Sequence, residues 1–417
     1  MVAKKSHTIV PLEYDIFFGM DVDKKSAATT IVDHYKEIRS ITMPNNADMI
    51  IKYTQKRFSD KKVAFVYESG PTGYGLYDQL TQAGYTCLVV APSTVPTPPG
   101  SQVKTNRIDG RKLATSLRGG ELTGIRVPSR KYRDLRHLTQ LLKVTTKQSR
   151  NYKCRIKALL LVEGIPYPNT TKYDHWANNT ICKLETLDCN PEIRFKLDSL
   201  LENLRFHRQQ LLKIKKKIRH FCKNDSDIAD SIMFLLSLPG IGWIIAPVLL
   251  ARIGDWRNLK NVRELAGFIG LTPSEKSTGD KVNKGNITRI GDSYLRNMLI
   301  EGAWSSIRKD AELNEFYQRV YDRHPNNIAA RKAIVAVARK LTTRIFAVLT
   351  ERRVYTLEHK GYNKPDKKRK PNAPEDASTL RRTFKYELKR AKSSPVLTGS
   401  TCEKETPGHF YAQRAVS

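Results

Sequence analysis

Three acidic residues in the first 110 positions lie where carboxylates could hold a divalent metal ion. Asp21 ends or interrupts the apolar run in FFGMDV, with Asp23 as an alternative in the same loop, and Glu68 closes the apolar run VAFVYE. Asp109 follows in the polar segment KTNRIDGRKLA. Two divalent ions about 4 Å apart can activate a nucleophile and stabilise a leaving oxygen at a phosphodiester, and they need several hard oxygen ligands. An acid at a strand end is more often a plain surface residue, so each signal is weak alone.

A second group of candidates lies in a polar, glycine-containing segment, residues 270–296. Ser277 and Thr278 stand there beside a glycine, and three basic residues follow closely: Lys281, Lys284 and Arg289. A hydroxyl that attacks phosphorus needs deprotonation or nearby positive charge, and this segment supplies the charge. Serines in glycine-rich loops are mostly turn residues, so the alternative is a simple turn.

The segment LLSLPGIGWIIAPVLLA, residues 235–251, has the form of a helical hairpin with a short turn at Gly240 and Gly242. Such a turn exposes backbone N–H groups beside a helix N-terminus, which suits a DNA phosphate. A tight turn within a helical core is the alternative. The uncharged stretch 232–251 is as long as a bilayer span, but its prolines and glycines favour two helices over one spanning helix.

Residues 14–92 alternate strand and helix patterns. Apolar strands are expected within 14–22, 27–32, 61–69 and 85–92, a more polar strand within 34–43, and helices over 45–59, from about residue 73, and around Asp109. This order predicts a mixed sheet with helices against it, an α/β domain in which Asp21 and Glu68 could each place a carboxylate at one end of a sheet. Four prolines in residues 92–99 predict an exposed loop.

Two long helices are expected over residues 130–162 and 192–222, because apolar residues recur there at helical spacing. Residues 129–223 hold 22 Lys and Arg against 8 Asp and Glu, which is compatible with nucleic-acid contact and with a solvated coiled-coil spacer. Residues 164–190 between the helices carry weak signals. Residues 232–350 predict a second, mainly helical region.

The chain has 73 Lys and Arg against 41 Asp and Glu, a formal net charge of +32, which points to a polyanionic partner. Nucleic acid fits better than a membrane surface, because the basic residues are spread over several helices and a tail. Six separated cysteines without a CxxC pair indicate neither a zinc ribbon nor a disulfide framework, and fit a reducing cytosol. The first residues lack a continuous apolar stretch, which argues against secretion.

Taken in order, five motifs make the chain closely resemble the DEDD transposases of bacterial insertion sequences, a family that includes Piv-type invertases and bridge-RNA-guided recombinases. The motifs span about residues 14–350: GMDVDKKS, YESGPTG, KTNRIDGRKLA, LPGIGWIIAPVLLARIGD and LAGFIGLTPSEKSTGDKVNKGNITRIGDSYLRNMLIEGAW. The resemblance implies an α/β plus α fold: an RNase H-like, RuvC-type mixed-sheet domain, a helical coiled-coil region and a mainly helical transposase domain with a helix-hairpin-helix-like motif.

In the family pattern, Asp21, Glu68 and Asp109 would be ligands of Mg²⁺ or Mn²⁺, and Ser277 matches the nucleophilic serine. The resemblance also implies a phosphoserine link to DNA at a composite site of two subunits, a homodimer or homotetramer, and a noncoding guide RNA beside donor and target DNA. Many members have KTDxxDA where this chain has KTNRIDG. Asn106 therefore replaces an aspartate, either as a neutral ligand or as a position outside the ligand set.

The sequence thus predicts an insertion-sequence transposase or recombinase in the cytoplasm, associated with the nucleoid and without a membrane partner. A hydrolytic RuvC-like junction nuclease and a non-enzymatic nucleic-acid-binding protein are the alternatives. The predicted division is an N-terminal extension 1–13, a RuvC-like domain 14–128, a coiled-coil region 129–223, a transposase domain 228–352 and a basic tail 353–417. The predicted nucleic-acid contacts are Lys104, Arg107, Gly240, Gly242, Lys281, Lys284, Arg289 and Arg296.

Overall fold

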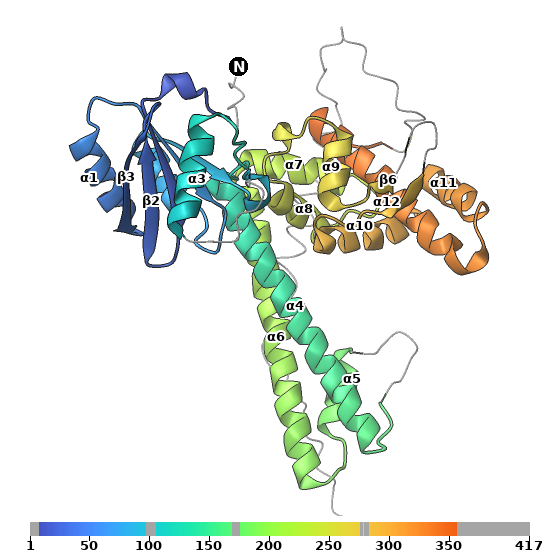
Figure 1. The fold of residues 1–417 in the computed structure, drawn as a ribbon. Helices are drawn as coiled ribbons and strands as arrows, with labels where there is room; N and C mark the ends of the chain where they lie inside the picture. The colour runs from blue at the N-terminus through green and yellow to red at the C-terminus, as the bar shows by residue number, and fades with distance from the viewer. Residues whose placement is uncertain (1–7, 97–105, 169–175, 276–277, 279–282, 357–417) are drawn as a thin grey trace, which may run out of the picture. The chain divides into compact units, whose positions relative to one another are not determined.

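The computed structural model describes residues 8–96, 106–168, 176–275, 278 and 283–356 (Figure 1). The chain divides into two compact units, Met1–Pro128 and Ser129–Ser417. The first unit has a mixed sheet with helices, and the second is mainly helical. The predicted α/β plus α fold class is therefore confirmed.

A five-stranded sheet in the order β3-β2-β1-β4-β5 forms the centre of the first unit. The strands are β1 Ile16–Val22, β2 Ser26–Val32, β3 Glu37–Pro44, β4 Val63–Glu68 and β5 Thr86–Val90. β1, β2 and β3 pair antiparallel, because short turns connect them. β4 pairs parallel with both β1 and β5, which requires helical crossovers between these strands. The strand predicted in the polar run 34–43 is present as β3.

Helices cover both faces of this sheet. Helices α1 (Ala47–Arg57) and α2 (Gly75–Gln82) contribute to one apolar cluster, with Phe18 and Phe65 from the sheet. Helix α3 (Asn106–Arg118) packs on the opposite face with Phe17 and Val66. Side chains alternate between the faces along each strand, so consecutive residues of β1 contribute to different clusters. Two 3-10 turns, Pro11–Glu13 and Pro92–Thr94, flank these elements.

Two glycines let α3 lie directly against the sheet. A Cβ on Gly19 of β1 would lie well under 3.0 Å from the backbone of Gly110 and Ala114 in α3. A Cβ on Gly110 would lie 2.9 Å from the carbonyl oxygen of Ala28 in β2. The approach of α3 to β1 and β2 is therefore backbone to backbone, and any side chain at Gly19 would force the helix away.

The second unit begins with two long helices, α4 (Arg130–Val162) and α6 (Pro191–Asn224), which lie side by side (Figure 1). The end of α4 packs against the start of α6, and the start of α4 against the end of α6, so the pair is antiparallel. Helix α5 (Asn178–Glu185) packs against this pair. The sequence did not predict α5, because its single short apolar face becomes evident only against α4 and α6.

The remaining helices of the second unit surround one large apolar core. They are α7 Ser226–Leu236, α8 Ile245–Ile253, α9 Val262–Ile269, α10 Ser293–Ser306, α11 Ala311–Tyr321 and α12 Asn326–Thr350, with a 3-10 turn η3 Trp256–Asn258. A two-stranded ribbon, β6 Pro273–Glu275 and β7 Lys284–Ile287, lies within the polar segment. The helix-turn-helix predicted over residues 232–251 is present, and none of the helices described is long and apolar enough to cross a bilayer.

Candidate active site and nucleic-acid interface

Asp21 and Glu68 lie at the same edge of the first unit's sheet. Met20 of β1 and Tyr67 of β4 are partners in the parallel ladder, and Asp21 and Glu68 are the next residues of the two strands. Neighbouring strands lie about 4.8 Å apart. Both acids are half-buried. The carboxyl ends of two adjacent parallel strands therefore each present one acid.

Both acids also belong to the face of the sheet that α3 covers. Phe17 and Gly19 meet α3, and Asp21 is the next residue of that alternation in β1. In β4, Val66 contributes to the α3 cluster, and Glu68 is two residues further along the same face. The alternation that places apolar residues under α3 thus places the two acids on one side.

Asp109 approaches this edge from α3. Leu113 and Leu117, one and two turns further along the helix, are fully buried against the sheet. Asp109 continues that stripe and is itself half-buried. Its neighbour Gly110 lies against Ala28, whose ladder partner in β1 is Asp21. The strand register and the helix packing therefore bring the third acid to the end of β1.

The donor set consists of carboxylate oxygens, which suit a hard divalent cation. Within the described ranges, however, no three His, Cys, Asp or Glu side chains are gathered closely enough to hold an ion. The backbone thus places the acids on one face and at one edge of the sheet, and binding of an ion would require their carboxylates to move closer together.

Two further candidates flank these acids. Asp23 is exposed in the turn after β1, where its carboxylate accepts a hydrogen bond of 2.7 Å from the Lys24 amide. This is the role of a turn aspartate, and Asp21 is the better placed of the two. Asn106 is the first residue of α3, three positions before Asp109. Its side chain, and that of Arg107, lie outside what the structure describes.

The hairpin between α7 and α8 contains both glycines of the LPGIG motif. Gly240 has a φ of +85°, and a Cβ there would collide with the Gly302 carbonyl and the Ser306 hydroxyl of α10. That hydroxyl donates a hydrogen bond of 2.6 Å to the Pro239 carbonyl. Gly240 therefore has a structural role. Gly242 is exposed, and no heavy atom would lie within 4 Å of a Cβ added there, so a ligand can approach this part of the backbone.

Hollows with basic side chains lie next to the hairpin. One, of about 360 Å³, is lined by the hairpin together with Ser305 and Lys309. A second, of about 720 Å³, is lined by Gly242 together with Lys215 and Arg219 of α6. Sequence reasoning did not single out these three cations, because they are distant from LPGIG in the chain and only packing brings them to it.

The polar segment is described in part. Ser277 and Lys281 lie outside the described residues, as does Lys104, and only the backbone of Lys284 is described. Thr278 and Arg289 are exposed, and Arg289 has a left-handed φ of 56°. Arg296 is buried, and its guanidinium donates hydrogen bonds to the carbonyls of Ile269 and Arg289. Its guanidinium is thus hydrogen-bonded inside the unit and is not presented to a phosphate, unlike the predicted contact.

Two family profiles match the chain. A DEDD transposase profile of the IS110 type matches residues 18–163, and the Transposase IS116/IS110/IS902 family profile matches residues 233–318. A putative transposase of Sinorhizobium fredii is 31% identical over 299 residues, which cover 70% of this chain and 72% of the relative. The chain belongs to this family of transposases.

Further relatives agree with this membership. The transposase for insertion sequence element IS1533 of Leptospira borgpetersenii is 26% identical over 300 residues, covering 69% of this chain and 84% of the relative. The transposase for IS1111A of Coxiella burnetii is 23% identical over 256 residues, 60% of this chain and 68% of the relative. This transposase is accordingly a DNA-binding enzyme that cleaves and transfers DNA strands, with an RNase H-like DEDD domain that indicates divalent-metal use.

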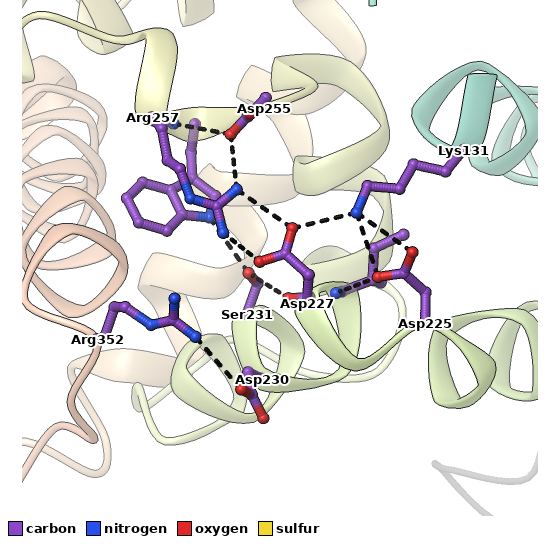
Figure 2. A network of polar contacts seen from close by, with 10 residues as sticks. Lys131, Asp225, Asp227, Asp230, Ser231, Asp255, Arg257 and Arg352 are labelled. Atoms are coloured by element: carbon purple, nitrogen blue, oxygen red, sulfur yellow. Dashed lines mark hydrogen bonds and ion pairs between the residues drawn. The ribbon is translucent and has the colours of Figure 1, made fainter. Parts of the chain in front are cut away.

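A polar network holds helix α7 of the transposase in place (Figure 2). Lys131 of α4 donates to Asp225 and Asp227, at 3.2 and 3.1 Å, and Asp225 caps α7 by accepting from the Ile228 amide. Arg257 donates to Asp227 through both terminal nitrogens. The Arg257 hydrogen bond, aided by Lys131, holds the pKa of Asp227 below its usual range although burial opposes this. The network thus fixes the N-terminal end of α7, the helix that leads into the LPGIG hairpin.

Replacing Asp227 with asparagine should therefore lower the free energy of unfolding at pH 7 by about 1–2 kcal/mol, a moderate figure because Arg257 is 40% exposed. A carboxyl group whose pKa is lowered on folding stabilises the folded protein at pH values above its unfolded pKa. This contribution is lost as the pH falls through the pKa of the folded state. The difference between the two proteins should be constant from pH 7 to 5 and shrink below about pH 4.

Chemical denaturation across this pH range measures the effect. Asp230→Asn is the matched control on the same helix, since Asp230 meets only the exposed Arg352 at 3.4 Å in the drawn network (Figure 2). A difference that persists unchanged to pH 2, or an equal loss in the control, would contradict this role of Asp227.

Proposed function

We propose that this transposase cuts and rejoins DNA with Mg²⁺ or Mn²⁺ held by Asp21, Glu68 and Asp109, and with Ser277 as the nucleophile. The observation that supports the metal site is the placement of Asp21 and Glu68 on the face of the sheet that α3 covers, at the ends of the paired strands β1 and β4, with Asp109 in the first turn of α3. The bound ion would neutralise charge on the phosphate under attack. The half-buried setting of the acids strengthens any charge interaction made there.

Asn106 completes the proposed ligand set as a neutral donor. It begins α3 at the same end of the helix as Asp109. An amide oxygen can bind a hard cation but adds no charge, so this site carries three negative charges where many family members have four. Weaker affinity for the second of two ions follows from this substitution.

The proposed serine chemistry is a phosphoryl transfer. The Ser277 oxygen attacks phosphorus as the bond from phosphorus to a DNA oxygen breaks, so the serine loses its proton and the departing DNA hydroxyl gains one. A DNA hydroxyl then attacks the phosphoserine, restores the serine and joins the strands. The exposed Arg289 supplies positive charge in this segment, to which Lys281 and Lys284 belong in the sequence.

The proposed partners follow from charge and from family membership. Phosphates would contact the open hairpin backbone at Gly242, with Lys309 beside it. We propose a noncoding guide RNA as a further ligand and a homodimer or homotetramer as the active assembly, in which one subunit's acids act with another's serine. The excess of 32 positive charges is ample for both nucleic acids.

The test of the nucleophile is the covalent intermediate. Ser277→Ala should abolish protein–DNA adducts trapped from a radiolabelled element end, because alanine has no hydroxyl to attack phosphorus, while binding of the same DNA changes less than about twofold. Thr278→Ala is the matched control and should retain adducts. Adducts that persist without Ser277 would overturn the assignment.

A hydrolytic nuclease acting through the acids alone is the second candidate, favoured by the placement of all three on the first unit. It predicts DNA cleavage that is metal-dependent and unaffected by Ser277→Ala. Strand joining that depends on Ser277 would exclude it.

A further inference from the structure

The hollow of about 720 Å³ beside the hairpin, here called the hairpin groove, is not explained by the proposed chemistry. It lies within the second unit, between α4, α6, α8 and α10. Leu142, Ile218 and Met298 form part of its apolar surface, and Trp243 follows directly after the open Gly242. Its size and its mainly apolar lining are those of a site for a flat organic group.

Aromatic rings in this groove are paired with cations. The Arg219 guanidinium lies over the Trp243 ring at 5.7 Å from its centre. Lys143 lies over the Tyr294 ring at 4.7 Å, and the guanidinium of Arg252 is 6.0 Å from the same ring. Within proteins such pairs can simply stabilise helix packing. Here, however, Trp243, Tyr294 and Arg219 also line a hollow, so both rings and this guanidinium are accessible to a ligand.

The charge of the groove selects the ligand. Lys215 and Arg219 line it and Lys143 flanks it, against the acidic lining residue Glu301, whereas Arg252 is ion-paired with Asp292 at 3.3 Å. Rings that accept a stacked base, next to cations that accept phosphate, are the two elements of sequence-tolerant single-strand binding. An apolar peptide would leave these cations unused.

We propose that the hairpin groove binds an unpaired nucleotide of the DNA strand, with its base stacked on Trp243 and its phosphates at Lys215 and Arg219. This goes beyond the proposed function, which assigns the hairpin backbone to phosphate and places the chemistry elsewhere. We favour DNA over RNA as the ligand because a transposase cleaves DNA. Cleavage produces strand ends that can separate from the duplex. A base held here would keep a cut end from diffusing away.

The full-length protein and a fluorescein-labelled 20-nucleotide oligo-dT test this by anisotropy at fixed salt. Trp243→Leu should weaken binding roughly 5- to 100-fold, the range for loss of one stacked base. Trp243→Phe keeps an aromatic face and should recover most of the affinity. Trp176→Leu is the matched control, since Trp176 is also partly buried with a lysine 5.5 Å from its ring but lies far along the chain from the groove.

The outcomes separate the proposal from its rivals. Equal losses in Trp243→Leu and Trp176→Leu, or an unchanged affinity in Trp243→Leu with its thermal unfolding intact, would overturn it. Loss of oligo-U binding with oligo-dT binding retained would assign the groove to RNA instead. Trp243→Phe that binds no better than Trp243→Leu would show a packing role, whereas a selective loss that phenylalanine rescues supports stacking.

Discussion

Asp21→Asn is expected to lower the rate of metal-dependent DNA strand cleavage by about three orders of magnitude. The change removes one negative ligand from the proposed site. Metal ions contribute several kcal/mol to transition-state stabilisation, and each 1.36 kcal/mol corresponds to a tenfold change in rate. The asparagine preserves shape and backbone pairing at the end of β1. Single-turnover cleavage of a labelled element end, at several Mg²⁺ concentrations, measures the effect.

Asp23→Asn is the matched control, because Asp23 is two residues away, exposed, and bonded within its own turn. Its cleavage rate should be within about threefold of that of the unchanged protein, since substitutions of exposed residues outside the core and the metal site have small effects. Glu68→Gln and Asp109→Asn should resemble Asp21→Asn. Cleavage that survives in Asp21→Asn, or is lost equally in Asp23→Asn, would contradict the proposed metal site.

Gly19→Ala is the second change with a large expected effect. It should reduce the free energy of unfolding of the first unit by about 3 kcal/mol or more, at the upper end of overpacking costs. The added methyl group would lie well under 3.0 Å from backbone atoms of Gly110 and Ala114, and backbone atoms cannot move aside as a flexible side chain can. Since α3 carries Asp109, cleavage should fall with stability. Urea denaturation and the cleavage assay measure both.

Gly75→Ala provides the control for this substitution. Gly75 begins α2, and nothing lies within 4 Å of a Cβ placed there. Alanine at such a helical position should leave stability unchanged or raise it slightly, by up to about 1 kcal/mol. A Gly19→Ala protein as stable as the Gly75→Ala protein would show that the backbone of α3 does not lie directly against β1.

Together, Asp21→Asn and Gly19→Ala distinguish the effect of losing a metal ligand from the effect of displacing helix α3. Asp21→Asn should leave unfolding nearly unchanged while cleavage is lost. Gly19→Ala should lower both, and its remaining cleavage should fall further as temperature rises, because the displaced α3 unfolds more readily.

The sequence allowed most of the secondary structure to be predicted for a definite physical reason. Strands β1, β4 and β5 are buried on both faces and appear in the sequence as short apolar runs, and helices 130–162 and 192–222 repeat apolar residues at helical spacing, so local pattern suffices. Helix α5 and the β6–β7 ribbon were not predicted as elements. They are short, and their pairing depends on residues that are distant or separated by a polar insertion.

Arg296 and Gly240 show a limit of reasoning from residue type. A positive charge and a glycine beside a proline are both typical of phosphate contacts, yet Arg296 binds backbone carbonyls within the fold and Gly240 lies against Gly302. Local sequence cannot distinguish a group that faces solvent from one that satisfies buried carbonyls, because that depends on what packs over it.

By itself, the sequence determined the α/β plus α order of elements, the strong positive charge, the family motifs and the three acids worth testing. Only the tertiary structure decided that Asp21 and Glu68 share the α3 face, that Gly19 and Gly110 let α3 lie directly against β1 and β2, and that Arg219 of α6 reaches Trp243. The physical reason is that parallel strand pairing and helix packing join residues far apart in the chain, and no local pattern encodes that contact.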